Sequence, residues 1–109
     1  MSEEMKMSLL ALGNARETVE IEGLDGQSIT VTIKPLTWEQ EYRISAVIEE
    51  KIKRGIPQNV ADRDYMLLTV QSGIVEPKFT EHELMMLKVG VVTEISRRIA
   101  SLSGTSQKK

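Results

Sequence analysis

Residues 79–104 read FTEHELMMLKVGVVTEISRRIASLSG, and this stretch decides the fold. Thr80 followed three residues later by Glu83 is the pattern of a capping box, which predicts that a helix begins here. Apolar residues then recur at steps of three or four: Leu84, Leu87, Val91, Ile95, Ile99 and Leu102. In a helix these side chains share one side, and an apolar stripe of this length must be buried against other elements. Gly104 is the expected end of the helix.

Gly90 is the weak point of this helix, because glycine inside a helix costs about 1 kcal/mol relative to alanine. Two interpretations remain open. Gly90 either bends one helix over residues 81–103, or divides the stretch into a short helix over 81–88 and a longer one from Val91. We expect the single, bent helix.

Two runs before this stretch alternate between apolar and polar residues. Residues 18–22 read TVEIE and residues 28–34 read SITVTIK, and β-branched residues dominate both runs. Asp25-Gly26 in the link is a turn signal, so the pattern predicts a β-hairpin over residues 18–34. A hairpin alone is unstable in water, so we expect helices or further strands to cover its apolar face. That face comprises Val19, Ile21, Ile29, Val31 and Ile33.

Two further helices are expected between the hairpin and residue 79. Thr37 caps a helix over about residues 38–54. A second helix, over about residues 60–72, is apolar around much of its circumference, and Pro77 favours an extended chain over residues 74–78. The apolar side of the first helix is predicted to comprise Trp38, Tyr42, Ile44, Val47, Ile48 and Ile52.

Together these segments predict an α+β fold, in which an N-terminal β-hairpin is followed by three to four α-helices packed as one small domain. The domain is expected to span residues 16–104, which suits a chain of 109 residues. Residues 1–15 are expected to form a partly ordered N-terminal segment, and residues 105–109 a flexible tail.

The composition excludes several classes of function. The chain has no cysteine, which excludes a disulfide scaffold, thiolate zinc sites and cysteine catalysis. Its net charge of −2 supplies no basic field to attract nucleic acid, so no nucleic-acid partner is expected. A run of about eighteen apolar residues is missing, so we expect no membrane-spanning helix and no membrane association.

No pattern in the sequence indicates catalysis, a cofactor or a metal. His82 is the only histidine, and its neighbours Glu81 and Glu83 point around a helix rather than to one side of it. A solvent-exposed His82 is therefore the better interpretation. The carboxylates of residues 39–64 form no recognisable acid/base arrangement. We expect a protein that is not an enzyme.

Two segments carry a resemblance to a known family. Residues 31–37, VTIKPLT, followed by a Glu-rich helix, resemble the opening of the small tail assembly chaperones of long-tailed bacteriophages and prophages, the XkdN-like group. Residues 73–77, GIVEP, followed by an acidic stretch and a helix that ends IASLSG, resemble the rest of that family. The resemblance covers the order of elements from about residue 19 to residue 104.

The resemblance implies a role without catalysis. Such proteins bind the tape measure protein, hold its long helical chain soluble and help to recruit tail tube subunits. They act in the cytoplasm of the bacterial host and are absent from the mature virion. A structural or connector subunit of a virion is the alternative function. A small nucleic-acid-binding regulator, using the basic clusters at residues 51–54 and 97–98, is a third.

Five apolar side chains are candidates for partner binding. Met85, Met86, Val89 and Val92 lie partly or wholly off the buried stripe, so a client helix, a second copy of the chain or deep burial must cover them. A homo-oligomer and client binding are both open. Trp38 is the fifth candidate, because tryptophan is enriched in binding hot spots. For Trp38 we nevertheless expect packing against the hairpin.

Overall fold

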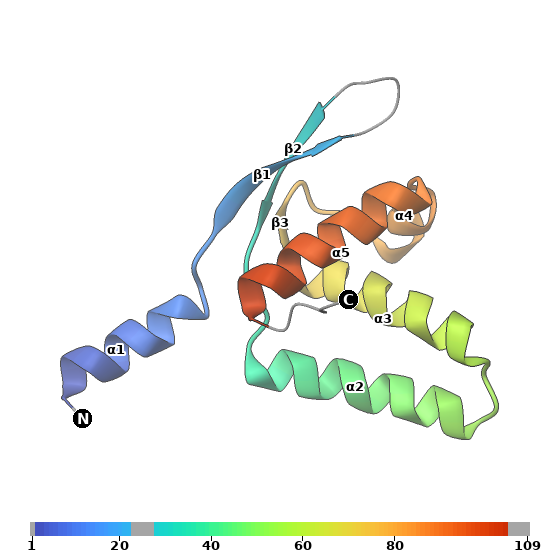
Figure 1. Ribbon diagram of the computed structural model, residues 1–109, viewed down its shortest axis with the longest axis horizontal. Coiled ribbons are helices and arrows are strands. Elements are labelled where there is room, and N and C mark those ends of the chain that lie inside the picture. Colours follow the sequence, from blue (N-terminus) through green and yellow to red (C-terminus); the bar gives the residue numbers. More distant parts are fainter. Residues whose placement is uncertain (1, 23–27, 105–109) are drawn as a thin grey trace.

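The computed structural model describes residues 2–22 and 28–104, and Figure 1 shows the course of the chain. The helices are α1 (Glu3–Leu12), α2 (Trp38–Lys53), α3 (Gln58–Gly73), α4 (Glu81–Met85) and α5 (Val89–Ser103). The strands are β1 (Glu17–Glu22), β2 (Ser28–Ile33) and β3 (Ile74–Glu76). The predicted α+β fold is confirmed. The expected turn at Asp25-Gly26 and the expected tail at 105–109 lie outside the described residues.

The sheet is antiparallel, in the order β1-β2-β3. β1 and β2 form the predicted hairpin, with Val19 opposite Val31. The extended segment before Pro77 becomes a third strand, because Ile74 pairs with Ile33 at the end of β2. The backbone N–H of Lys34 donates to the carbonyl of Gly73 at 2.8 Å, which joins the end of β2 to the end of α3.

The apolar face of the hairpin is covered by helices over most of its length. Val19, Ile21, Val31 and Ile33 are buried, as predicted. The prediction is wrong for Ile29, which is 45% exposed. Ile29 lies opposite Ile21, which is buried, so the cover of this face extends over Ile21 on β1 but over only part of Ile29 on β2.

The core is centred on α5. Ile95 and Ile99 of the predicted stripe are 1% and 0% exposed, and they belong to one cluster with the buried hairpin residues and with Val70 of α3. A β-carbon added at Gly73 would lie 2.7 Å from Cγ2 of Ile99, closer than carbon atoms pack, so glycine permits this contact between α3 and α5. Ser103 at the end of α5 accepts a hydrogen bond of 2.7 Å from the backbone N–H of Leu36.

The expectation of one bent helix over residues 81–103 is wrong. The helix stops after Met85, and α5 begins at Val89 after Lys88, whose backbone is extended. This break changes the direction of the chain, so that α4 packs on α3 while α5 packs on both α3 and β1. Gly90 lies in the first turn of α5 and does not mark the division.

Trp38 does not pack against the hairpin, contrary to expectation, because its side chain is 90% exposed. α2 has two apolar stripes rather than one. Ile44 and Ile48 face α3 and form a second buried cluster with Ala61, whereas Trp38 and Tyr42 lie on another side of the helix. The Tyr65 hydroxyl also donates to the Glu41 carboxylate, which fixes the rotation of α2 against α3.

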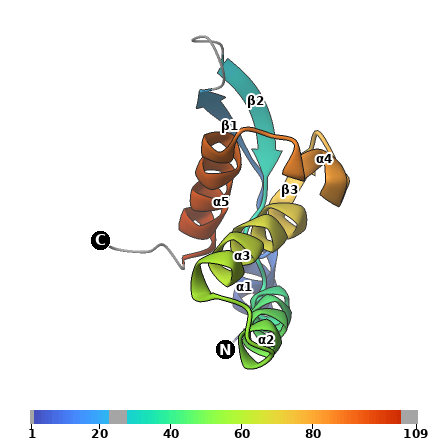
Figure 2. The ribbon, with the colours of Figure 1, turned by 90° about the vertical axis from the view of Figure 1, so that its right-hand side faces the viewer.

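The elements form layers that both views show. α5 lies beside the sheet, α3 lies next to α5, and α2 lies outermost against α3 (Figures 1 and 2). α1 projects from the start of β1, away from these layers (Figure 1). The sequence predicts a partly ordered segment here, whereas the structure has a helix. Ser2 caps this helix by accepting a hydrogen bond from the backbone N–H of Met5.

The burial of α5 predicts the outcome of three substitutions. Ile95→Ala and Ile99→Ala should each lower the free energy of unfolding by about 2–5 kcal/mol, because each leaves a cavity in the core. Ser101→Ala, on the exposed side of the same helix, should change it by less than about 0.5 kcal/mol. Urea denaturation followed by circular dichroism measures all three. Equal, small shifts in the three midpoints would contradict the assignment of this stripe to the core.

Candidate protein-binding surface

Three apolar side chains are exposed where α4 gives way to α5. Met85, Met86 and Val89 are 66%, 73% and 76% exposed, and we name these three residues the junction surface. They are separated in the sequence only by Leu87 and Lys88. Isolated exposed apolar residues are common on protein surfaces, but a cluster of long apolar side chains is typical of a binding site.

The local structure explains why these side chains face outward. Leu84 is 1% exposed and Leu87 is half-buried against the core, so the two anchor the segment on either side of Met85 and Met86. The predicted capping box also forms. Thr80 Oγ1 accepts a hydrogen bond of 3.1 Å from the backbone N–H of Glu83, and the Glu83 carboxylate accepts one of 2.9 Å from the backbone N–H of Thr80. The position of α4 is therefore set by its cap and by Leu84.

Val92 differs from the other predicted partner-binding residues. Its side chain is half-buried and packs against the main core cluster. Val91 beside it is buried, whereas Val89, the first residue of α5, is exposed. Val92 therefore borders the junction surface, and only part of it is available to a partner.

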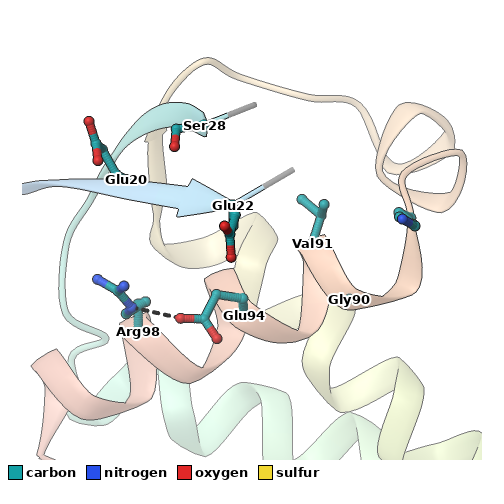
Figure 3. Close-up of a pocket in the computed structure, with 8 residues that line it drawn as sticks. Glu20, Glu22, Ser28, Gly90, Val91, Glu94 and Arg98 are labelled. Atoms are coloured by element: carbon teal, nitrogen blue, oxygen red, sulfur yellow. Dashed lines mark hydrogen bonds and ion pairs between the residues drawn. The ribbon is translucent and has the colours of Figure 1, made fainter. Parts of the chain in front are cut away.

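A charged hollow lies beside the junction surface, between β1 and α5 (Figure 3). Its volume is about 660 Å³, and its walls carry carboxylates from both elements, with Lys88 and Arg98 as the cations. In Figure 3, the Glu22 side chain points from β1 toward Glu94 on α5. The full lining comprises Glu20, Glu22, Ser28, Lys88, Gly90, Val91, Glu94 and Arg98.

Glu94 is held by two arginines of its own helix. Its carboxylate accepts from Arg97 at 2.6 Å and from Arg98 at 2.8 Å. The hydrogen bond from Arg97, and after it the one from Arg98, lower the pKa of Glu94 from 4.5 to about 2. The bond from Arg97 has the larger effect. Glu94 therefore stays ionised at any pH near neutrality, and Arg98 is drawn along the wall of the hollow.

The structure does not bring Trp38 to the junction surface. Trp38 is the first residue of α2, and the start of α2 and α4 lie apart in both views (Figures 1 and 2). The large apolar residues of α1, in the segment expected to be a partly ordered terminus, are all exposed. The signal was present, because Ser2 followed by Glu3 and Glu4 is a helix start, and Met5, Leu9 and Leu12 recur at helical spacing.

Within the described residues, the structure has neither a cluster of metal-ligating side chains nor a membrane-spanning helix. His82 is exposed, as the sequence predicts. Among residues 2–22 and 28–104, no three or more His, Cys, Asp or Glu side chains come together as a possible metal site. In the same part of the chain, no helix combines the length and the apolar character that crossing a bilayer requires.

Comparison of the chain with protein-family models, with curated proteins and with solved structures found no match.

The low pKa of Glu94 predicts how stability depends on pH. The folded state binds a proton at Glu94 less readily than the unfolded state, so its contribution is complete above about pH 4.5 and is lost as the pH falls toward 2. Because Glu94 is near the surface, we expect at most about 1 kcal/mol. Glu94→Gln removes this contribution, so the wild type should be the more stable at pH 6 and lose that advantage by about pH 2.

Urea denaturation at several pH values measures this difference. Glu20→Gln is the control, because Glu20 is an exposed carboxylate on the β1 side of the same hollow. At pH 6 Glu20→Gln should cost less stability than Glu94→Gln, because Glu20 takes part in none of the ion pairs of the described residues. A constant gap between wild type and Glu94→Gln from pH 6 to pH 2 would contradict the role of Glu94.

Proposed function

We propose that the protein is a non-enzymatic tail assembly chaperone of a long-tailed phage or prophage, which binds a helical segment of the tape measure protein on the junction surface. One observation carries this proposal. Met85, Met86 and Val89 are each at least 66% exposed, although Leu84 and Val91 beside them are buried in the core. The resemblance of residues 31–37 and 73–77 to tail assembly chaperones supports the choice of client.

The chemistry of the junction surface suits a helical client. An amphipathic helix binds by placing its apolar side on an apolar surface. Two of the three side chains are methionines, which are flexible and polarizable and therefore adapt to different apolar partners. A chaperone that holds a long helical chain meets many successive apolar segments, so adaptable contacts serve it better than one rigid pocket.

The neighbouring hollow supplies charges for the polar side of the client. Glu20 and Glu22 on β1 are exposed, and Lys88 lies between the hollow and Val89. A helix on the junction surface that runs along the hollow places its polar residues against these groups. Such charges orient a partner and make its association sensitive to salt.

The proposed place of action follows from the resemblance to tail assembly chaperones. On that basis the protein acts in the cytoplasm of the bacterial host, helps to bring tail tube subunits to the client, and is absent from the mature virion.

Co-expression with a helical fragment of the tape measure protein from the same genome tests the proposal. The test variant is Met86→Glu with Val89→Glu. Each apolar side chain that a client buries contributes about 1.5–3 kcal/mol, so the double variant should weaken binding by a factor of about 100 or more. The expected result is a folded variant, by circular dichroism, that no longer keeps the fragment in the soluble fraction.

A matched control adds the same charge to the two helices on either side of the junction surface. His82→Glu with Ser101→Glu changes exposed polar residues of α4 and α5, and Ser101 is about three turns from Val89, so the client should stay soluble. Undiminished client solubility from the folded test variant would place the binding surface elsewhere. Failure of the test variant to fold, with a folded control, would show that the junction surface belongs to the core.

A further inference from the structure

The α1 helix has apolar residues that nothing in residues 2–22 and 28–104 buries. It has ten residues, none of them buried, and its five large apolar side chains are between 57% and 64% exposed. Isolated helices of this length are marginal in water, so most of the stability of such a helix comes from packing. The five side chains are Met5, Met7, Leu9, Leu10 and Leu12.

These side chains lie on two sides of α1. Met5, Leu9 and Leu12 follow steps of four and three and form one stripe, whereas Met7 and Leu10 form another. A helix that is apolar on two sides needs two covers. A single groove would leave one of the stripes in water.

A second unpartnered apolar surface lies at the same end of the molecule. Trp38 and Tyr42 are 90% and 69% exposed and stand one turn apart on α2. Ser45 and Glu49 follow on that side, so the apolar part spans only the first turns of α2. A β-carbon added at Gly13, just after α1, would lie 3.6 Å from Cγ2 of Thr37, the cap of α2. The end of α1 and the start of α2 are therefore adjacent.

The connection between α1 and β1 keeps α1 away from the aromatic pair of its own chain. Three backbone hydrogen bonds continue beyond the helix, from the N–H groups of Gly13, Asn14 and Ala15 to carbonyls of α1, at 3.1, 3.0 and 3.4 Å. β1 begins at Glu17, only two residues later. The connection is thus a hydrogen-bonded turn, and α1 points away from α2 (Figure 1).

We infer that the protein forms a two-fold dimer in which α1 of each copy packs on Trp38 and Tyr42 of the other copy. The two α1 helices then lie together, so that each has both of its apolar stripes covered. Because both surfaces are at one end of the molecule, a single two-fold axis satisfies them reciprocally. This inference does not depend on the proposed function, because it uses none of the junction surface.

The available area is enough for a stable dimer. Trp38 and Tyr42 offer about 300–400 Å², and the five apolar side chains of α1 bring the total to the order of 800 Å² per copy. That is the area that one partner buries in a stable protein–protein interface.

Light scattering after gel filtration of the full chain tests the dimer. The wild type should have the mass of two chains. Two double variants should each give folded monomers. One is Leu9→Glu with Leu12→Glu, which alters the apolar side of α1, here called the arm. The other is Trp38→Ser with Tyr42→Ser, which alters the aromatic pair that the arm contacts. His82→Glu with Thr93→Glu should remain dimeric. Trp38 is the only tryptophan, so its fluorescence should shift to the blue on dimerisation and to the red in the arm variant.

Mixing the two damaged variants tests the exchange itself. The mixture retains one intact contact, between the arm of one variant and the aromatic pair of the other, so it should form heterodimers that neither variant forms with itself. A wild type that is monomeric at all concentrations, a dimer that survives either pair of substitutions, or a mixture without heterodimers would overturn the inference. A monomer whose Trp38 fluorescence is shielded by α1 would also overturn it, because α1 would then cover its own chain.

Discussion

The burial of Ile95 and Ile99 against the sheet is the contact on which the rest of the structure depends. These two residues bring α5 onto β1 and β2, and their cluster includes Val70 of α3, so one contact organises three parts of the chain. Helices α3 and α5 approach so closely that a β-carbon at Gly73 of α3 would displace Ile99. Once α5 and α3 are placed, α2 is placed as well, because its Ile44 and Ile48 pack with Ala61 of α3.

This compact arrangement leaves apolar residues outside the core in two places. The junction surface is exposed because Leu84 and Leu87 turn inward on either side of Met85 and Met86. The α1 helix and the aromatic pair on α2 are exposed because a hydrogen-bonded turn directs α1 away from the domain. The two surfaces lie apart (Figures 1 and 2), so the dimer contact that we infer and the client that we propose would not compete for the same residues.

Local patterns predicted the elements that local interactions determine. The capping boxes at Thr37 and Thr80 both form, and the end of α5 has the left-handed glycine expected at Gly104. The alternation of β1 and β2 gave the correct hairpin, and the helical stripe identified Leu84, Val91, Ile95 and Ile99 as buried. Each of these features depends on residues close together in the sequence.

The errors concern directions that only tertiary packing sets. The sequence predicts that Trp38 and Ile48 belong to one apolar side of α2. The hydrogen bond from Tyr65 to Glu41 and the packing of α2 on α3 instead leave Trp38 on the outside. A stripe of helical period runs unbroken through residues 84–102, so it carries no sign that the chain changes direction before Val89. Ile29 has the same local pattern as Val31 and lies opposite the buried Ile21, yet its side chain is half exposed, so the alternation alone does not tell how far the cover extends. For the candidate site, the sequence indicated Met85, Met86 and Val89, but the hollow formed by β1 and α5 depends on contacts between distant segments.

Oxidation of the native methionines by dilute peroxide, followed residue by residue with mass spectrometry, tests whether Met85 and Met86 lie outside the core and are covered by the client. Methionine oxidation follows exposure, and Met66 in α3 is a half-buried internal reference. The account predicts that Met85 and Met86 oxidise faster than Met66 in the free protein, and that a tape measure fragment slows their oxidation while leaving the rate at Met66 unchanged. Oxidation of Met85 and Met86 as slow as that of Met66 in the free protein, or unaltered by a bound fragment, would contradict it.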